Sequence, residues 1–399
     1  MRSVYVVGTA DTKLLELEYI KGVISAAGVD AILVDVGTTG HESSCDITPA
    51  EVAAYHPDGA NAVRCDDRGQ AVEAMALALE RFVEAHADEI AGIIGAGGSG
   101  GTSLVTPAMR ALPVGVPKMM VSTVASSNVA PYVGPSDIAM MYSVTDVSGI
   151  NRISRQVLGN AANAMAGMVA NDVPVGDNDM PVIGLTMFGV TTQLVTRLAD
   201  ELADRFDPLV FHATGTGGQS MEKLVDSGMF VAVLDMTTTE VADHIVGGIF
   251  SAGLDRIGAI ARTGVPYVGS VGAVDMVNFG ALDTVPAKFV DRNLYVHNPQ
   301  VTLMRTTAEE NTAIGEFIAT KLNACDGQVR FLLPEGGVSA IDAPDQPFHD
   351  PEADEALFAA IEANVEQTEN RIVTRVPANI NDEAFVQAAL AALDDVMTH

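Results

Sequence analysis

Residues 90–102 read Ile90-Ala91-Gly92-Ile93-Ile94-Gly95-Ala96-Gly97-Gly98-Ser99-Gly100-Gly101-Thr102. The apolar run at the start indicates a buried strand, and the amphipathic residues from Thr102 to Leu112 indicate a helix. Between strand and helix, five of the seven residues from Gly95 to Gly101 are glycine. A strand, a glycine-rich turn and a helix in this order are typical of an α/β fold with a parallel sheet, in which ligands bind at the turns.

The same alternation continues on both sides of this stretch. In the first half it predicts further strands at 4–7, 31–36, 118–122 and 138–144, and helices at 14–27, 71–87 and 150–170. The second half begins with a strand at 182–187 and ends with a helix at 382–397. Between them we expect, among other elements, a helix at 238–250 and a short strand at 294–297. Residues 171–181 are polar and turn-rich and separate the halves. We therefore expect two Rossmann-like three-layer α/β domains, at residues 1–175 and 181–399, with mostly parallel sheets and a cleft between them.

Composition limits the class of partner. The 399 residues include 52 Asp and Glu against 22 Lys and Arg, a formal net charge of −30. This balance argues against nucleic acid, whose phosphates require clustered basic residues, and against an anionic membrane surface. The three cysteines show no disulfide or zinc spacing, which indicates a reducing compartment. No apolar run approaches the ~20 residues of a membrane-spanning helix, so we expect a cytoplasmic protein.

The glycine-rich turn is the sharpest chemical motif. Consecutive glycines let backbone N–H groups approach an anion, and the start of a helix adds unpaired donors. Phosphate would then lie on Gly97, Gly98, Ser99 and Gly100, with the hydroxyl of Thr102 nearby, whereas the alternative is a tight turn without a ligand. The residues also match GxGxxG, but the next strand, at 118–122, carries no acidic residue of the kind that binds a dinucleotide ribose. The Walker pattern is absent, because Gly101 occupies the position of its lysine.

Three further turns of the first half follow strands or precede helices, at the same predicted edge of the sheet. Thr9, Asp11 and Lys13 follow the first strand, where Lys13 can pair with a phosphate and Asp11 can approach a metal or hydroxyl. The alternative is that this turn only caps the helix. Thr38, after the second strand, can donate a hydroxyl, or it can belong to a simple turn. Arg68 can clamp a phosphate, or it can pair with its neighbour Asp67.

The second half carries its own polar strand ends. The stretch from His212 to Gly218 resembles a second anion cradle, or else a plain glycine-rich turn. We treat His212, Asp235, Glu240 and Asp275 as candidate catalytic residues for acid–base chemistry. Metal ligands are not assigned, since a Glu240–His244 pair one helical turn apart is more often a simple contact.

Several longer motifs resemble one family: that of the ATP-binding N-terminal region of the tomato mosaic virus resistance protein, with its uncharacterised bacterial relatives. The motifs are Gly8–Lys13, Gly95–Leu104, Ser122–Ser126, Thr186–Thr192, Leu234–Asp243, Ser270–Gly280 and Gly337–Asp342. The resemblance covers nearly the whole chain. It implies two Rossmann-like subdomains, an ATP site with Mg²⁺ in the first and a homodimer. It assigns the ATP contacts to Lys13, Thr38, Arg68 and Gly97-Gly98-Ser99-Gly100. The antiviral action of the plant member is not expected to transfer.

These observations give three hypotheses. In the first, an enzyme couples ATP to chemistry on a small metabolite in the cleft between the domains. In the second, a non-catalytic module binds ATP and changes its association with a partner or a second copy. In the third, a dehydrogenase binds NAD at the GxGxxG turn.

Overall fold

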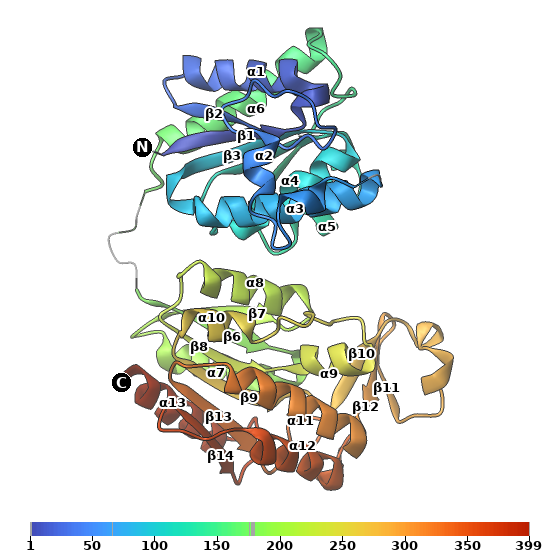
Figure 1. Cartoon of the computed structure of the whole chain (residues 1–399). Helices are drawn as coiled ribbons and strands as arrows, with labels where there is room; N and C mark the ends of the chain where they lie inside the picture. Colours follow the sequence, from blue (N-terminus) through green and yellow to red (C-terminus); the bar gives the residue numbers. More distant parts are fainter. Residues whose placement is uncertain (1, 66, 175, 177–179, 399) are drawn as a thin grey trace. The chain divides into compact units, whose positions relative to one another are not determined.

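The computed structural model describes residues 2–65, 67–174, 176 and 180–398. The chain forms two compact units, residues 1–175 and residues 176–399. Each unit is a layered α/β structure, as expected from the sequence (Figure 1). We call them unit 1 and unit 2. The cleft expected between the two domains stays a prediction.

Unit 1 is built on a five-stranded parallel sheet of order β2-β1-β3-β4-β5. Helices α1 and α6 cover one face and α3 and α4 the other (Figure 1). Alternate residues of β1 separate the two cores: Val4 and Val6 pack under α1 and α6, and Tyr5 and Val7 under α3 and α4. The strands are β1 Ser3–Gly8, β2 Ala31–Asp35, β3 Ile90–Gly97, β4 Lys118–Ser122 and β5 Ala139–Tyr142; the helices are α1 Ala10–Ala26, α2 Pro49–Ala53, α3 Arg68–Ala85, α4 Ser99–Ala111, α5 Ala130–Val133 and α6 Arg152–Ala170.

Unit 2 is built on a six-stranded parallel sheet of order β7-β6-β8-β9-β13-β14. Its apolar residues form one large core and two smaller ones. The strands are β6 Val182–Met187, β7 Asp207–His212, β8 Ala232–Thr237, β9 Tyr267–Gly272, β13 Val329–Pro334 and β14 Arg371–Val376; the helices are α7 Thr192–Leu202, α8 Thr216–Asp226, α9 Thr239–Val246, α10 Gly258–Thr263, α11 Ala308–Asn323, α12 Pro351–Asn364 and α13 Glu383–Thr398.

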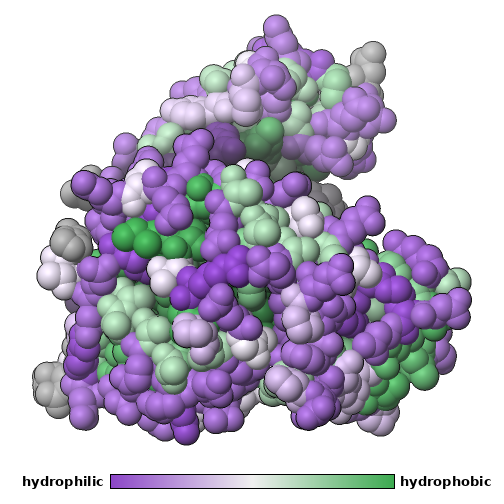
Figure 2. All heavy atoms as spheres, turned by 90° about the horizontal axis from the view of Figure 1, so that it is seen from below, coloured by the Kyte–Doolittle hydropathy of each residue, from purple (hydrophilic) through white to green (hydrophobic). Residues whose placement is uncertain are grey.

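A three-stranded antiparallel sheet of order β10-β12-β11 is an addition that the sequence pattern did not indicate. It consists of β10 Met276–Phe279, β11 Leu294–Asn298 and β12 Val301–Arg305, of which only the second was expected. β11 is an edge strand and mostly exposed. Figure 2 shows apolar side chains at the right of the view, over this small sheet, and Val290 and Val296 are at least half exposed there.

Three of the helix boundaries that differ from expectation have a local reason. Helix α1 begins at Ala10 rather than Leu14, and the non-helical backbone of Lys13 kinks its first turn. Helix α4 begins at Ser99, so the last glycines of the turn lie within its first turn. Helix α9 ends at Val246 rather than 250, because Gly247 adopts a left-handed conformation with φ 101° and closes the helix.

Candidate functional site

The order of the first sheet reverses between β1 and β3. The chain runs from β1 to β2 on one side and reaches β3 on the other, and ligands of open α/β sheets bind at the carboxyl ends of such strand pairs. Helices α1 and α4 both begin here, with Thr9 and Gly98 as their N-cap residues. Neither N-cap residue caps its helix with its own side chain, but the Ala10 amide at the start of α1 donates to Asp35 Oδ1 at 3.0 Å. Among the described residues, the start of α4 is therefore the one that presents a set of unpaired amides to this edge.

The glycine-rich turn leaves space beside its backbone. A Cβ atom built on Gly100 or Gly101 would meet no heavy atom within 4 Å, so internal packing does not require glycine at either position. Ser99 and Gly100 are exposed, whereas Thr102 is buried. The Thr102 hydroxyl lies 2.8 Å from the Gly98 carbonyl and 2.6 Å from Ser122 Oγ. Thr102 thus fixes the turn to β4, and the turn itself stays open.

The corresponding turn of unit 2 provides an internal comparison. There the amides of Gly215 and Gly218, at the start of α8, donate to Glu240 Oε1 at 2.7 and 3.0 Å. A Cβ on Gly218 would lie 2.0 Å from Glu240 Oε2, so glycine is required to admit this carboxylate. The stretch from His212 to Gly218 is therefore an anion cradle, and its anion is the protein's own Glu240. Within the described part of unit 1, no carboxylate occupies the turn at Gly98.

Among the Lys and Arg side chains that the structure describes, those without a partner lie in unit 1. Among the described residues, the lysine and arginine side chains without an ion pair, hydrogen bond or ring contact are Lys13, Arg64, Arg68, Arg152 and Arg155. Arg68 opens α3, and Lys13 lies in the kinked first turn of α1. Arg64 and Arg68 are exposed, so an external anion can reach both.

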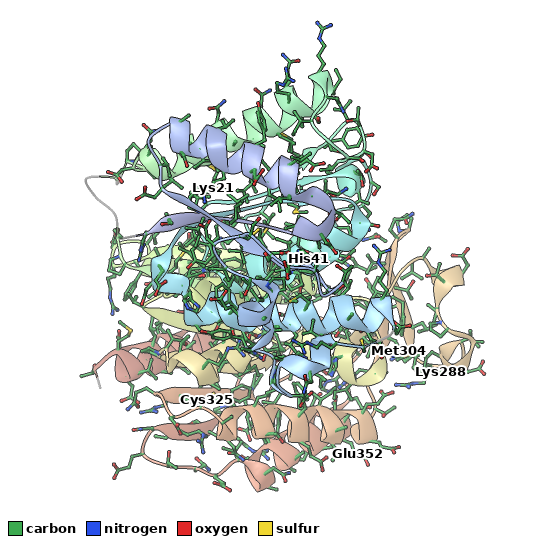
Figure 3. All side chains as sticks on the ribbon, turned by 45° about the horizontal axis from the view of Figure 1, so that its top comes forward. Lys21, His41, Lys288, Met304, Cys325 and Glu352 are labelled. Carbon is green, nitrogen blue, oxygen red and sulfur yellow. The ribbon has the colours of Figure 1, made fainter. Side chains whose placement is uncertain are left out.

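The end of β2 and the loop after it place a carboxylate and an imidazole beside the β1 turn. Asp35, fully buried, accepts the amides of Ala10 at 3.0 Å and Gly37 at 2.9 Å through Oδ1. Its Oδ2 lies 2.8 Å from His41 Nε2. Thr39 donates its hydroxyl to Asp11 Oδ2 at 2.8 Å, while Asp11 Oδ1 is buried without a hydrogen-bond partner in the described chain. Figure 3 labels His41 in this loop.

A pocket of about 720 Å³ opens beside this loop. We call it the β2 pocket; it is lined by Gly37, Thr38, Thr39, Gly40, His41, Ser43, Thr48, Pro49, Ala50, Ala53, Ala60, Val63, Arg64 and Met75. Thr38, one of the expected contacts, lies in its wall. Its size is in the range of small-molecule sites, and it combines apolar side chains with hydroxyls and a cation.

Two candidate catalytic residues of unit 2 meet in a buried ionic network. Arg256 donates to Asp235 at 2.6 Å through both terminal nitrogens, to Glu240 at 2.8 Å and to Glu222 at 3.1 Å. Tyr267 and Thr186 also donate to Asp235. Burial raises the pKa values of Glu222 and Glu240, and Arg256 and the backbone amides oppose that effect. Asp235 and Glu240 are fully buried and bonded within the protein. The contacts that the network makes therefore support the fold.

The other two candidates lie elsewhere. His212 is exposed at the end of the edge strand β7 and stacks on Phe188, with ring centroids 5.4 Å apart. Asp275 follows β9 and is fully buried, and it accepts the Ser339 hydroxyl at 2.8 Å. Burial raises the pKa of Asp275 to about 7, and the nearby carboxylate of Asp342 adds to the effect. Among the described residues, no hydrogen bond or ion pair joins His212 or Asp275 to Asp235 or Glu240, and a joint catalytic role of the four residues stays a prediction.

The Asp275 carboxylate belongs to a second buried cluster with one cation. Arg305 binds Asp354 at 2.7 Å and lies 3.6 Å from Asp342. Burial raises the pKa of Asp354 to about 8, with further contributions from Asp342. This cluster joins β12 of the small sheet to the loops after β9 and β13 and to α12.

Sequence reasoning did not single out Asp35, His41, Arg64 or Arg256 as functional. Asp35 ends an apolar strand and could have been found by its position, because the carboxyl end of β2 is where α/β folds place polar groups. Arg64 and His41 lie in segments without periodicity. Only the folded chain brings them to one pocket.

Comparison with known proteins establishes the family. Residues 2–174 match the N-terminal domain, and residues 180–397 the C-terminal domain, of an uncharacterised protein family, UPF0261. The chain belongs to UPF0261. This membership confirms the resemblance drawn from the sequence motifs.

Members of UPF0261 occur in bacteria and in tomato. A UPF0261 protein of Mesorhizobium japonicum is 56% identical over 395 residues, which cover 99% of each chain. A UPF0261 protein of Clostridium tetani is 46% identical over 401 residues, again 99% of each. The tomato (Solanum lycopersicum) ToMV resistance protein Tm-1(GCR237) is 43% identical over 410 residues, which cover 96% of this chain and 54% of the tomato protein. This chain therefore spans about half of the tomato protein.

Comparison with a solved structure gives no information on the function of this UPF0261 chain. UDP-N-acetylglucosamine 2-epimerase from Rickettsia bellii matches it with 8% identity and a TM-score of 0.24, over 100% of this chain and 97% of that one. This score is too low to support an argument about function. Among the described residues, no helix is both long and apolar enough to cross a membrane. In the same residues, no group of three or more His, Cys, Asp or Glu side chains is arranged to hold a metal ion.

Proposed function

We propose that the chain is an ATP-binding protein that couples ATP to chemistry on a small metabolite. The observation that carries the proposal is the contrast between the two glycine-rich turns. In unit 2 the turn holds a carboxylate of the protein itself, whereas the turn of unit 1 has a similar glycine-rich backbone and binds no anion from the described residues. An open cradle of this kind fits a phosphate chain.

The neighbouring residues fit the same ligand. Lys13 and Arg68 provide unpaired positive charge for phosphates, and Thr38 provides a hydroxyl at the mouth of the β2 pocket. The amides of Gly98, Ser99 and Gly100 provide donors at the start of α4.

A nucleotide-bound Mg²⁺ ion fits this edge as well. Mg²⁺ usually keeps several waters and needs only one or two protein carboxylates in addition to the phosphates. Asp11, with one buried oxygen free of hydrogen bonds in the described chain, is the carboxylate that could serve. The ion would neutralise phosphate charge there.

Titration calorimetry with ATP, ADP and NAD, each with and without Mg²⁺, tests the proposal. Replacing Lys13 with Ala should weaken ATP binding by about 10- to 100-fold, the value of a hydrogen bond to a charged group. The matched control is Lys21→Ala on the same helix, since Lys21 is already paired with Asp46 at 2.6 Å. Tighter binding of NAD than of ATP, or no binding of either, would refute the proposal.

The glycine turn allows a second test that separates binding from stability. Gly100→Ala should not destabilise unit 1, since the new methyl group meets no heavy atom within 4 Å and alanine favours a helix by about 1 kcal/mol. It should nevertheless weaken ATP binding if phosphate lies against that backbone. Unchanged affinity would place the phosphates elsewhere.

A further inference from the structure

The β2 pocket contains functional groups that nucleotide binding does not require. Its walls come from the loop after β2, from α2, from the short helix at Ala60–Val63 and from α3. Val63 and Met75 line it with apolar surface, and Arg64 brings a cation without a partner among the described residues. Such a pocket suits a small molecule that carries an anionic group.

His41 lies in the wall of this pocket and is oriented by a buried carboxylate. Asp35 is held in place by two backbone amides, and its second oxygen faces His41 Nε2 at 2.8 Å. The contact lacks the in-line geometry of a hydrogen bond, and neither atom has another partner in the described residues. A ring turned so that a proton on Nε2 points at Oδ2 would complete the bond. The other nitrogen, Nδ1, would then be a proton acceptor, and Thr39 Oγ1 lies 3.5 Å from it.

The pocket wall also contacts the turn that we assign to the nucleotide. Thr39 donates to Asp11, which lies in the first turn of α1. Gly37 allows this crowding, since a Cβ there would lie 2.7 Å from His41 Cε1 and 3.3 Å from Asp11 Cγ. A molecule in the β2 pocket would therefore lie beside the β1 turn, within the same unit.

We propose that the β2 pocket binds the second substrate, a small molecule with a hydroxyl and an anionic group. Arg64 binds the anion, and His41, oriented by Asp35, takes the proton of the hydroxyl. This inference rests on the proposed ATP function and names its second substrate. It also places the acceptor within unit 1, rather than in the cleft between the domains that the sequence led us to expect.

The reaction that this arrangement serves is phosphoryl transfer to the hydroxyl. The hydroxyl oxygen forms a bond to the terminal phosphorus of ATP, and the bond from that phosphorus to the bridging oxygen breaks. ADP leaves with the electron pair of the broken bond, and the hydroxyl proton goes to His41 Nδ1. A buried carboxylate that holds the imidazole in one tautomer is the usual way in which such a base is prepared.

Nuclear magnetic resonance of the full chain with ¹⁵N-labelled histidine tests the site without turnover. We expect His41 to carry its proton on Nε2 and its Nδ1 signal to shift when glycerate or glycerol 3-phosphate is added. Arg64→Gln should abolish that shift, whereas Arg152→Gln, which removes another unpaired arginine of unit 1 outside the pocket, should leave it intact. No response of His41 to either probe, or a response that does not depend on Arg64, overturns the proposal.

A ³¹P assay of transfer from ATP to the probe that binds provides the second measurement. His41→Gln should lower the rate by about 10²- to 10⁴-fold, the contribution of a general base, and should leave ATP affinity unchanged. An unchanged rate overturns the role of His41 while ATP binding stands. If the unmodified chain binds no ATP, the proposed function is refuted instead. Failure of the His41 role and failure of the proposed function therefore give different results.

Discussion

Replacing Arg256 with Met should be among the most damaging single changes in unit 2. The guanidinium makes four hydrogen bonds to three carboxylates, those of Asp235, Glu240 and Glu222, and its side chain is 1% exposed. Methionine fills similar space but offers no donor and no charge. Three carboxylates would then remain in the core without a cation.

The magnitude follows from burial. Each carboxylate keeps other donors: Asp235 keeps Thr186 and Tyr267, and each glutamate keeps two backbone amides. What is lost is the compensating charge, and removing one partner of a buried ion pair costs about 3–5 kcal/mol. In a unit of this size about 1 kcal/mol lowers the melting temperature by 2–4 °C. We expect the unfolding of unit 2 to shift down by about 6–20 °C.

Arg262 provides a control with the same number of bonds. It makes four hydrogen bonds to Asp226 and Asp255, but its side chain is 48% exposed. Surface ion pairs contribute about 0–1 kcal/mol, so Arg262→Met should lower the melting temperature by less than about 4 °C. Differential scanning calorimetry of both variants measures the two shifts in melting temperature. Equal shifts would refute the reasoning that burial, rather than bond number, sets the cost.

Further predictions concern carboxylates and crowding. The pKa values of Asp275 and Asp354 are raised to about 7 and about 8. These two carboxyl groups thus hold more protons in the folded chain than in the unfolded one between about pH 4 and pH 8, and their contribution to stability should fall as pH rises through that window. Urea midpoints from pH 5 to 9 should show this fall, and Asp342→Asn should flatten it; a midpoint that rises with pH contradicts it. Glu240→Ala empties the anion cradle of unit 2, so added formate should raise the melting temperature of this variant and not that of the native chain. Gly37→Ala should lower the unfolding free energy of unit 1 by about 1–3 kcal/mol in denaturant titrations, since the new methyl group overlaps its neighbours; an unchanged midpoint would show that the loop yields freely.

Much of the fold was predictable because it is local. Apolar runs of strand length alternate with amphipathic helices, and strands β4 and β6 lie at the expected residues. The small antiparallel sheet was not predictable in the same way, because β10 and β12 pair across an interval of more than twenty residues. Its strands are short, and their pairing depends on the loops between them.

The same distinction between local sequence and distant contacts applies to the candidate site. The glycine turn, Lys13 and Thr38 were predicted from residue type and from position after a strand. Their role as nucleotide contacts stays a prediction. The unit 2 acids were selected by the same rule, but Asp235 and Glu240 proved to be fully bonded to Arg256. A polar residue at a strand end can serve a ligand or the protein itself, and sequence alone does not distinguish the two.

The sequence by itself determined the class of fold, the family, and the turns at which a ligand could bind, because these depend on the order and periodicity of residues along the chain. The tertiary structure alone decided which glycine turn is filled and which is open. It also decided that His41 and Arg64 share one pocket beside a buried Asp35. The physical reason is that burial and pairing depend on residues distant in the chain, and those contacts exist only once both units have folded.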